Sequence, residues 1–343
     1  MPKSKIGVLI VNLGTPDSPS VPDVAKYLRE FLMDGRVIDI PFWRRWLLIN
    51  LVIVPTRSPQ SAKAFQELWH KEGGSPLKMH GLRSAELLQN SLGNDFQVEF
   101  AMRYQNPSLK SVLLRFRDKG LNELIVIPLY PQFASASTGS TLEKVMDEMK
   151  RWETTPTLKI ISQFSDHPLF IKAFAEIGKK YMTQTKYDHY LFSYHGLPER
   201  QVLKASCDNY CRLADCCSAY HSKNKYCYRA QCFETTRLLV KELGIKPEDH
   251  TVCFQSRLGK TPWIKPYTDE VIGQLTKRGI KNVLVFSPAF VADCLETTIE
   301  IGVEYKKLFQ AQGGQRWQMV ESLNVHPAWI NCLKQLVLEN IKK

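Results

Sequence analysis

Short apolar segments rich in β-branched residues alternate along the chain with longer segments whose apolar residues recur at helical spacing. The apolar segments predict strands at Ile6–Leu13, Gln97–Arg103, Leu124–Tyr130, Leu158–Gln163, His189–His195, Thr251–Ser256, Asn282–Pro288 and Gln318–Leu323. The helical spacing predicts helices at Val24–Phe31, Pro107–Lys119, Leu142–Lys150, Leu169–Met182, Phe233–Leu243, Thr268–Arg278 and Glu296–Phe309. Strands that alternate with helices and are nearly continuous in apolar residues indicate parallel sheets buried on both faces, so the pattern predicts an α/β fold.

Three motifs occur twice in the same order. A Gly-x-Pro turn follows a strand in Val11–Pro16 and again in Ser193–Pro198, Met102-Arg-Tyr is echoed by Ser256-Arg-Leu, and Val126-Ile-Pro is echoed by Phe286-Ser-Pro. This repeat predicts two similar α/β halves, residues 1–155 and 156–324. The remaining residues, 325–343, predict a final helix that packs back on the first half.

The carboxyl ends of the strands define where a ligand is expected in such a fold. If the two halves face one another, the cleft is expected to be lined by the strand ends and the loop after Pro288, with side chains from Leu13, Arg103, Tyr130, His195 and Gln255. The chain contains neither a Gly-x-Gly-x-x-Gly nor a Gly-x-x-x-x-Gly-Lys-Ser/Thr motif at a strand end, so we expect no nucleotide cofactor.

Composition adds the class of protein. The chain has 343 residues, 44% of them hydrophobic and 23% charged, and a formal net charge of +12, which is typical of a soluble protein of two domains. The first five residues lead directly into a strand with no signal-peptide pattern, so a cytoplasmic location is expected. No basic run with interleaved aromatic residues accompanies the positive charge, and nucleic acid is therefore not an expected partner.

His195 and the segment after Pro288 are the candidates for chemistry. His195 ends a strand just before Gly-x-Pro, which suits a base or metal ligand, although a histidine there also occurs as a structural partner of a neighbouring carbonyl. Asp293 and Glu296 have the spacing of a helix-capping pair. If the helix begins near Asp293, Glu296 points into the cleft, where histidine and carboxylate suit Fe(II) or proton transfer.

Several motifs in sequence order resemble those of the ferrochelatase family. They are Val11–Pro16, Gly73–Leu77, Met102–Tyr104, Tyr130–Gln132, Ser193–Pro198, Gln255–Gly259 with Pro262-Trp263, Tyr267–Glu270 and Phe290–Glu296. The resemblance covers nearly the whole chain. It implies two Rossmann-like halves and insertion of Fe(II) into protoporphyrin IX with release of two protons, the last step of haem synthesis.

The resemblance also implies roles for individual residues. His195 and Glu296 match the family's active-site and iron-binding pair, and Asp293 is an expected proton relay. A second set is expected to bind the porphyrin: Leu13, Ser75, Arg103, Tyr104 and Tyr130. Cys294 stands where the family commonly has histidine, which argues against a mechanism that requires a second histidine there.

Six of the nine cysteines lie within residues 206–232. Thiols this dense in a reducing compartment favour a metal. The insertion is similar to those that hold a [2Fe–2S] cluster in some bacterial members of the family, and structural zinc or free thiols are the alternatives. The ligands predicted for a cluster are Cys211, Cys216 or Cys217, Cys227 and Cys232.

The most apolar run, Phe42–Pro55, contains Arg44 and Arg45 near its start and is followed by Arg57. Its length suits a buried helix or an interfacial segment and is too short to span a bilayer. In the family the corresponding stretch is a lip of the porphyrin cleft that touches the membrane, so a peripheral membrane contact is expected. The net positive charge then suits a dianionic porphyrin and an anionic membrane surface.

Two alternatives to a protoporphyrin ferrochelatase remain. One is a chelatase for another metal or tetrapyrrole, and the other is a haem- or Fe–S-binding sensor without turnover.

Overall fold

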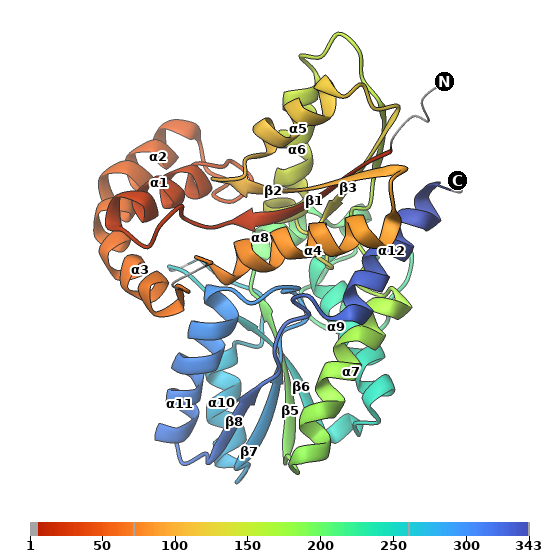
Figure 1. Cartoon of the computed structure of the whole chain (residues 1–343). Coiled ribbons are helices and arrows are strands. Elements are labelled where there is room, and N and C mark those ends of the chain that lie inside the picture. Colours follow the sequence, from red (N-terminus) through yellow and green to blue (C-terminus); the bar gives the residue numbers. More distant parts are fainter. Residues whose placement is uncertain (1–5, 71–72, 260, 342–343) are drawn as a thin grey trace. The chain divides into compact units, whose positions relative to one another are not determined.

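The computed structural model describes residues 6–70, 73–259 and 261–341. The first five residues, on which the expectation about a signal peptide depends, lie outside these ranges. The chain forms two compact units: unit 1 comprises Met1–Tyr130, Ala134–Gln163 and Ile330–Lys343, and unit 2 comprises Pro131–Phe133 and Phe164–Trp329. Each unit contains a four-stranded parallel sheet (Figure 1).

The sheet of unit 1 has the strand order β2-β1-β3-β4. Its strands are β1 (Ile6–Gly14), β2 (Phe96–Tyr104), β3 (Glu123–Pro128) and β4 (Thr157–Ile160). The helices are α1 (Val21–Leu32), α2 (Phe42–Leu47), η1 (Leu48–Ile53), α3 (Val54–Leu68), α4 (Pro76–Leu92), α5 (Leu109–Asp118), η2 (Ser135–Gly139), α6 (Ser140–Met149) and most of α12 (Pro327–Ile341).

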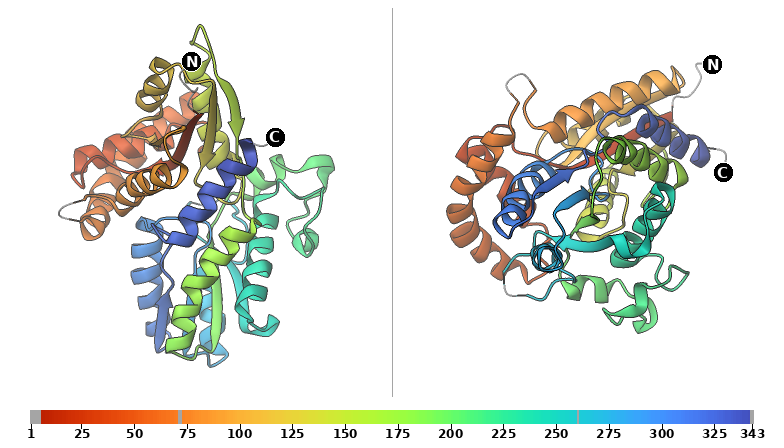
Figure 2. Two further views of the ribbon diagram at one scale, coloured as in Figure 1. Left: turned by 45° about the vertical axis from the view of Figure 1, so that its right-hand side comes forward. Right: turned by 90° about the horizontal axis from the view of Figure 1, so that it is seen from below.

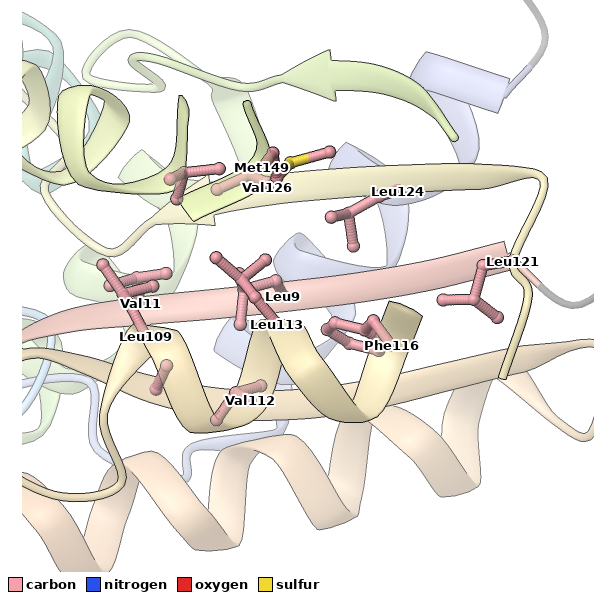
Figure 3. Close-up of a cluster of buried hydrophobic side chains, with 12 residues drawn as sticks. Leu9, Val11, Leu109, Val112, Leu113, Phe116, Leu121, Leu124, Val126 and Met149 are labelled. Carbon is pink, nitrogen blue, oxygen red and sulfur yellow. The ribbon is translucent and has the colours of Figure 1, made fainter. Parts of the chain in front are cut away.

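Alternate residues of β1 point to opposite faces of this sheet. Leu9 and Val11 join a buried cluster with α5 and α6, which Figure 3 shows around Leu113 and Phe116. On the other face α4 lies close to the sheet, because a side chain at Gly81 would place its Cβ 2.2 Å from the Phe100 ring. Both faces of the sheet are thus covered, as its continuous apolar strands require.

The sheet of unit 2 repeats this arrangement strand for strand in the order β6-β5-β7-β8. Its strands are β5 (His189–His195), β6 (His250–Gln255), β7 (Asn282–Phe286) and β8 (Arg316–Met319). The helices are α7 (Pro168–Gln184), α8 (Glu199–Lys204), η3 (Cys207–Asn209), η4 (Asp215–Cys217), α9 (Tyr228–Leu243), η5 (Pro247–Asp249), α10 (Thr268–Lys277), η6 (Glu296–Tyr305) and α11 (Lys306–Ala311). The prediction of two similar parallel α/β halves is confirmed.

The core of unit 2 has two sides. Leu191, Cys253 and Val285 pack in a cluster with residues of α10, η6 and α11. On the opposite face the rings of Phe192 and Phe286 stack with their centroids 5.0 Å apart. The cysteine-rich segment leaves this packed body after α8 and lies beside α9, where Figure 2 shows it as a long loop with short helical turns.

The structure differs from the predicted elements in several places. The strands predicted to reach Gln163 and Leu323 end early, at Ile160 and Met319, because the chain turns away from the sheet after one further hydrogen bond at each end. The helix predicted to begin at Phe233 begins at Tyr228. The helix predicted from Glu296 is a π-helix, η6, before it becomes α11.

Candidate functional site

His195 is held in one orientation by its own backbone. It ends β5 beside Gln255 of β6, and its Nδ1 lies 2.7 Å from the carbonyl oxygen of Gly196. A carbonyl only accepts hydrogen bonds, so Nδ1 carries the proton and the neutral ring has its lone pair on Nε2. The rings of Trp263 and Phe290 flank the imidazole at centroid distances of 6.4 and 6.5 Å. This arrangement leaves the lone pair on Nε2, a chemistry suited to accepting a proton or ligating a metal.

A carboxylate that sequence reasoning did not select, Glu300, interacts with His195. It lies on η6 and accepts hydrogen bonds from the backbone N–H of Ser256 at 2.9 Å and from the Tyr305 hydroxyl at 3.1 Å. Burial raises the pKa of Glu300, the hydrogen bonds from Ser256 and the charge of His195 oppose that rise, and the charge of Glu296 adds to it. Glu300 is therefore a carboxylate suited to accept a proton. Its position four residues after Glu296, on nearly the same helical face, is the signal that could have identified it.

Glu296 begins η6 and is half-buried. Beside it, burial first and then the charge of Glu296 raise the pKa of the Cys294 thiol, which keeps the thiol protonated. On η6, Glu296 lies close enough to Glu300 for its charge to raise the pKa of Glu300.

Asp293 does not cap the helix, as the Asp293–Glu296 spacing had allowed, because η6 begins only at Glu296. Its carboxylate instead accepts hydrogen bonds from the backbone N–H of Ser322 at 3.1 Å and from the Asn324 side chain at 2.7 Å. Asp293 thus fastens the loop after β7 to the loop after β8. These bonds fix the point from which η6 starts.

The strand ends of unit 1 carry a second polar cluster, in which sequence reasoning missed Asp34. Arg103 forms a salt bridge with Asp34 at 2.5 Å, and the hydroxyls of Tyr104 and Ser140 donate to the same carboxylate at 2.9 and 2.5 Å. Burial by itself would raise the pKa of Asp34, but the hydrogen bonds and the Arg103 charge outweigh burial and hold this pKa below its usual range. Arg103 is therefore fixed rather than solvated.

The other predicted porphyrin-binding residues also lie in unit 1. Leu13 is half-buried at the end of β1, and its N–H bonds to the side chain of Asn12. Ser75 is buried and directly precedes α4. Tyr130 follows β3, and burial raises the pKa of its hydroxyl.

The cysteine-rich segment forms a small pocket in unit 2. Its lining includes Cys207, Cys211, Cys216, Cys217 and Cys227. Four of these thiols form two pairs: Cys216 Sγ lies 4.0 Å from Cys211 Sγ, and Cys217 hydrogen-bonds to Cys227. Cys232 lies fully buried on α9 and does not line the pocket. All nine cysteines are described by the structure, and none forms a disulfide.

In the Cys217–Cys227 pair, the pKa values of the two thiols are shifted in opposite directions. The hydrogen bond from Cys217 and the backbone N–H groups at the start of α9 lower the pKa of Cys227 against the opposing effect of burial. The same hydrogen bond and burial raise the pKa of Cys217. Within residues 6–70, 73–259 and 261–341, no group of three or more His, Cys, Asp or Glu side chains is arranged to hold a single metal ion.

The apolar run around α2 and η1 lies largely on the surface. Phe42 is 66% exposed, Trp43 60% and Leu51 61%, whereas Ile49 is fully buried. Arg44 and Arg45 stack on the rings of Trp43 and Phe42. We call the exposed set the lip: Phe42, Trp43, Trp46, Leu47, Leu48, Leu51 and Val52. No helix in the described part of the chain has the length and apolar character needed to cross a membrane.

Comparison with known proteins shows the family of this chain. A family model described as Ferrochelatase matches residues 5–341. The chain belongs to the ferrochelatase family. It is an enzyme, a lyase that inserts iron into a porphyrin in haem synthesis.

The relatives match over nearly their full length. The ferrochelatase of Legionella pneumophila (strain Paris) is 45% identical over 335 residues, which cover 98% of this chain and 99% of the relative. The ferrochelatase of Coxiella burnetii (strain Dugway 5J108-111) is 42% identical over 340 residues, covering 99% and 95%. Among solved structures, SirB from Bacillus subtilis with Fe3+ matches with a TM-score of 0.53 and 15% identity, covering 98% of this chain and 95% of that chain, which supports the chelatase fold.

Proposed function

We propose that the porphyrin substrate is protoporphyrin IX and that His195 Nε2 is the atom that receives a pyrrole proton or binds the entering Fe(II). The single observation that supports this most is the fixed tautomer: Nδ1 donates to Gly196, so the lone pair is on Nε2. Insertion of Fe(II) breaks the two N–H bonds and releases both protons, and the iron binds all four ring nitrogens through their lone pairs, so no oxidant or reductant is needed.

Glu300 and Glu296 are the proposed route for those protons. Glu300 interacts electrostatically with His195 on one side and with Glu296 on the other, and its raised pKa suits a group that holds a proton transiently. Asp293 acts in this proposal by anchoring the start of η6 rather than by touching the substrate. In unit 1, Arg103 and Tyr104, fixed by Asp34, are proposed to bind the porphyrin together with Leu13, Ser75 and Tyr130.

The test mixes anaerobic protein, Fe(II) and protoporphyrin IX and records the haem spectrum. His195→Ala is expected to lower kcat by about 100-fold or more, the usual scale for loss of a general base. His250→Ala is the matched control, because His250 begins β6 at the opposite end of the sheet from His195. Turnover of coproporphyrin but not of protoporphyrin would contradict the substrate, and normal turnover by His195→Ala would contradict the site.

For the cysteine pocket we propose a [2Fe–2S] cluster ligated by Cys211, Cys216, Cys217 and Cys227. Two thiol pairs on one pocket suit two irons with two thiolates each, and the backbone N–H of Arg212 already donates to Cys216 Sγ. When bound, such a cluster would supply a covalent link among the four thiolates. The lining favours Cys216 and Cys217 together in place of the buried Cys232.

Protein purified without oxygen is expected to be coloured and to contain about two iron and two sulfide per chain. Cys216→Ser is expected to lose the colour, whereas Cys232→Ser keeps it. A colourless, iron-free wild-type preparation would contradict the cluster, and loss of colour in Cys232→Ser alone would contradict the ligand set.

We also propose that the lip makes a peripheral contact with an anionic membrane surface. The cytoplasmic location of the protein stays a prediction. Exposed tryptophan and leucine side chains next to Arg44 and Arg45 support this contact. Trp43→Ala with Leu51→Ala is expected to weaken binding to vesicles that contain phosphatidylserine at low salt. Leu82→Ala, an exposed leucine on α4 of the same unit, is the control. Equal binding of the two variants would contradict the proposal.

A further inference from the structure

Every polar group of the peptide between His195 and Gly196 is hydrogen-bonded. The carbonyl oxygen of His195 accepts from the Tyr228 hydroxyl at 2.8 Å, and the N–H of Gly196 donates to Gln255 O at 2.8 Å. The carbonyl of Gly196 in turn accepts from the His195 ring. The Gly196 carbonyl belongs to the next peptide along the chain, so the direction of the imidazole depends on how Gly196 is held between the two peptides. Tyr228 is the side chain that bonds to the first of them.

Gly196 itself leaves little room for adjustment. A side chain there would place its Cβ 2.8 Å from Gln255 O and 3.1 Å from the Trp263 ring. The peptide is thus enclosed on the side of β6, and a rotation would have to break the bond to Tyr228. Tyr228 is 8% exposed, and its hydroxyl also hydrogen-bonds to the Cys232 thiol.

Tyr228 also belongs to the start of the helix that carries the cysteine pocket. Cys227, a pocket cysteine, is the N-cap residue of α9, and Tyr228 is the first residue of the helix. Further along α9, Arg229 donates to Ala214 O at 3.0 Å and Arg237 donates to Cys217 O at 3.1 Å. Helix α9 is therefore bonded to the cysteine-rich segment through Arg229 and Arg237, and to the His195 backbone through Tyr228.

We propose that Tyr228 is a positioning residue for iron insertion, which fixes the His195–Gly196 peptide and couples the start of α9, with its pocket cysteine Cys227, to the direction of the His195 imidazole. This inference rests on the proposed role of His195 but on no ligand in the cysteine pocket. A change at Cys227 that shifts the first turn of α9 moves the Tyr228 hydroxyl. The His195–Gly196 peptide bonded to that hydroxyl then shifts, and with it the Gly196 carbonyl that holds the imidazole.

Tyr228→Phe removes one hydroxyl and keeps the ring that fills the core. Loss of one hydrogen bond of ordinary strength is expected to lower kcat roughly two- to tenfold, with the KM for porphyrin unchanged because Tyr228 does not belong to the proposed porphyrin-binding set. Tyr226→Phe is the matched control, since Tyr226 is an exposed tyrosine two residues away. Thermal unfolding of both variants checks that the fold is retained.

The second readout is the ¹⁵N NMR spectrum of histidine-labelled full-length protein, isolated and measured under argon, with His195→Ala used to assign the signal among the eight histidines. Wild-type protein is expected to show the Nδ1–H tautomer, and Tyr228→Phe a mixture of tautomers. In the wild-type background, Cys227→Ala is expected to shift the His195 signal and to lower kcat. In the Tyr228→Phe background it is expected to do neither. This non-additivity reports coupling between the two residues.

The outcomes separate the hypotheses. Wild-type protein that forms no haem overturns the proposed function. Full activity in His195→Ala overturns the proposed site. The positioning role is overturned if the wild type is active and His195→Ala is inactive, but Tyr228→Phe leaves both kcat and the His195 tautomer unchanged. A change in Tyr228→Phe with additive effects of Cys227→Ala overturns the coupling.

Discussion

Single hydrogen bonds decide what the ionisable side chains of this enzyme do. His195 and His189 stand at opposite ends of β5: His195 bonds through Nδ1 to a backbone carbonyl, and His189 bonds through Nε2 to the Thr251 hydroxyl at 2.9 Å inside the fold. Burial, followed by the charges of Arg278 and His250, lowers the pKa of His189 to about 4. The same residue type is thus a candidate base at one end of a strand and a neutral structural group at the other.

Glu300 is the residue whose replacement best tests the proton route. Glu300→Gln keeps the size and the hydrogen-bond acceptor toward Ser256 but cannot take a proton. We expect kcat to fall about 100-fold, on the scale of acid–base catalysis. Glu304→Gln, on the exposed side of η6, is the control. Equal activity of the two variants in the haem-formation assay would show that Glu300 only holds Ser256.

The lowered pKa of His189 predicts how stability depends on pH. The unfolded chain takes up a proton at this histidine near its ordinary pKa of about 6.5, whereas the folded chain does so only near 4. Its contribution to stability is therefore fully present above the unfolded pKa and decreases as the pH falls toward 4. Urea unfolding at several pH values should show a smaller decrease over this window in His189→Gln, and an identical slope would refute the assignment.

At the level of elements, close packing depends on small residues at particular contacts. Gly81 lets α4 approach the Phe100 ring of β2, as Gly178 lets α7 approach Phe286 of β7. On η6, residues four apart are neighbours, so the charge of Glu296 reaches Glu300. Helices here are placed by what they contact as much as by their own sequence.

Gly81→Ala tests this packing. Alanine favours a helix by about 1 kcal/mol over glycine, but its Cβ would lie 2.2 Å from the Phe100 ring, and overpacking typically costs about 1–3 kcal/mol. We therefore expect a net decrease in the free energy of unfolding of up to about 2 kcal/mol. Arg83→Ala on the exposed face of α4 is the comparison, and a more stable Gly81→Ala would contradict the close contact.

For the whole molecule, the chain crosses between the two units more than once. Unit 1 is completed by residues from Ile330 onward, which follow the whole of unit 2 in sequence. Lys159 of β4 donates to Asn340 O of α12 at 2.7 Å within that unit. The fold of unit 1 therefore depends on the last helix of the chain.

Leu333 tests this dependence, since it is fully buried on α12. Leu333→Ala is expected to lower the free energy of unfolding by about 2–5 kcal/mol, the usual range for such a truncation. Asn331→Ala, exposed on the same helix, should have little effect. If Leu333→Ala is as stable as Asn331→Ala in urea unfolding, the helix does not contribute to the core.

Local pattern was enough to predict the α/β fold, the internal repeat and the place of His195, because alternation, strand length and a Gly-x-Pro turn are properties of neighbouring residues. The turn after β5 already indicated a histidine at a strand end. The family motifs, which are equally local, led to iron insertion into a porphyrin.

Partners distant in sequence were decided only by the tertiary structure. Asp34 meets Arg103 across 69 residues, and Tyr228 meets His195 across 33. The separation of Cys232 from the pocket cysteines depends on where α9 begins, and Glu300 meets the backbone of Ser256 across 44 residues. Hydrogen bonds, burial and electrostatic interactions depend on distances in space, so the sequence determined which groups are present and the folded chain determined which of them act together.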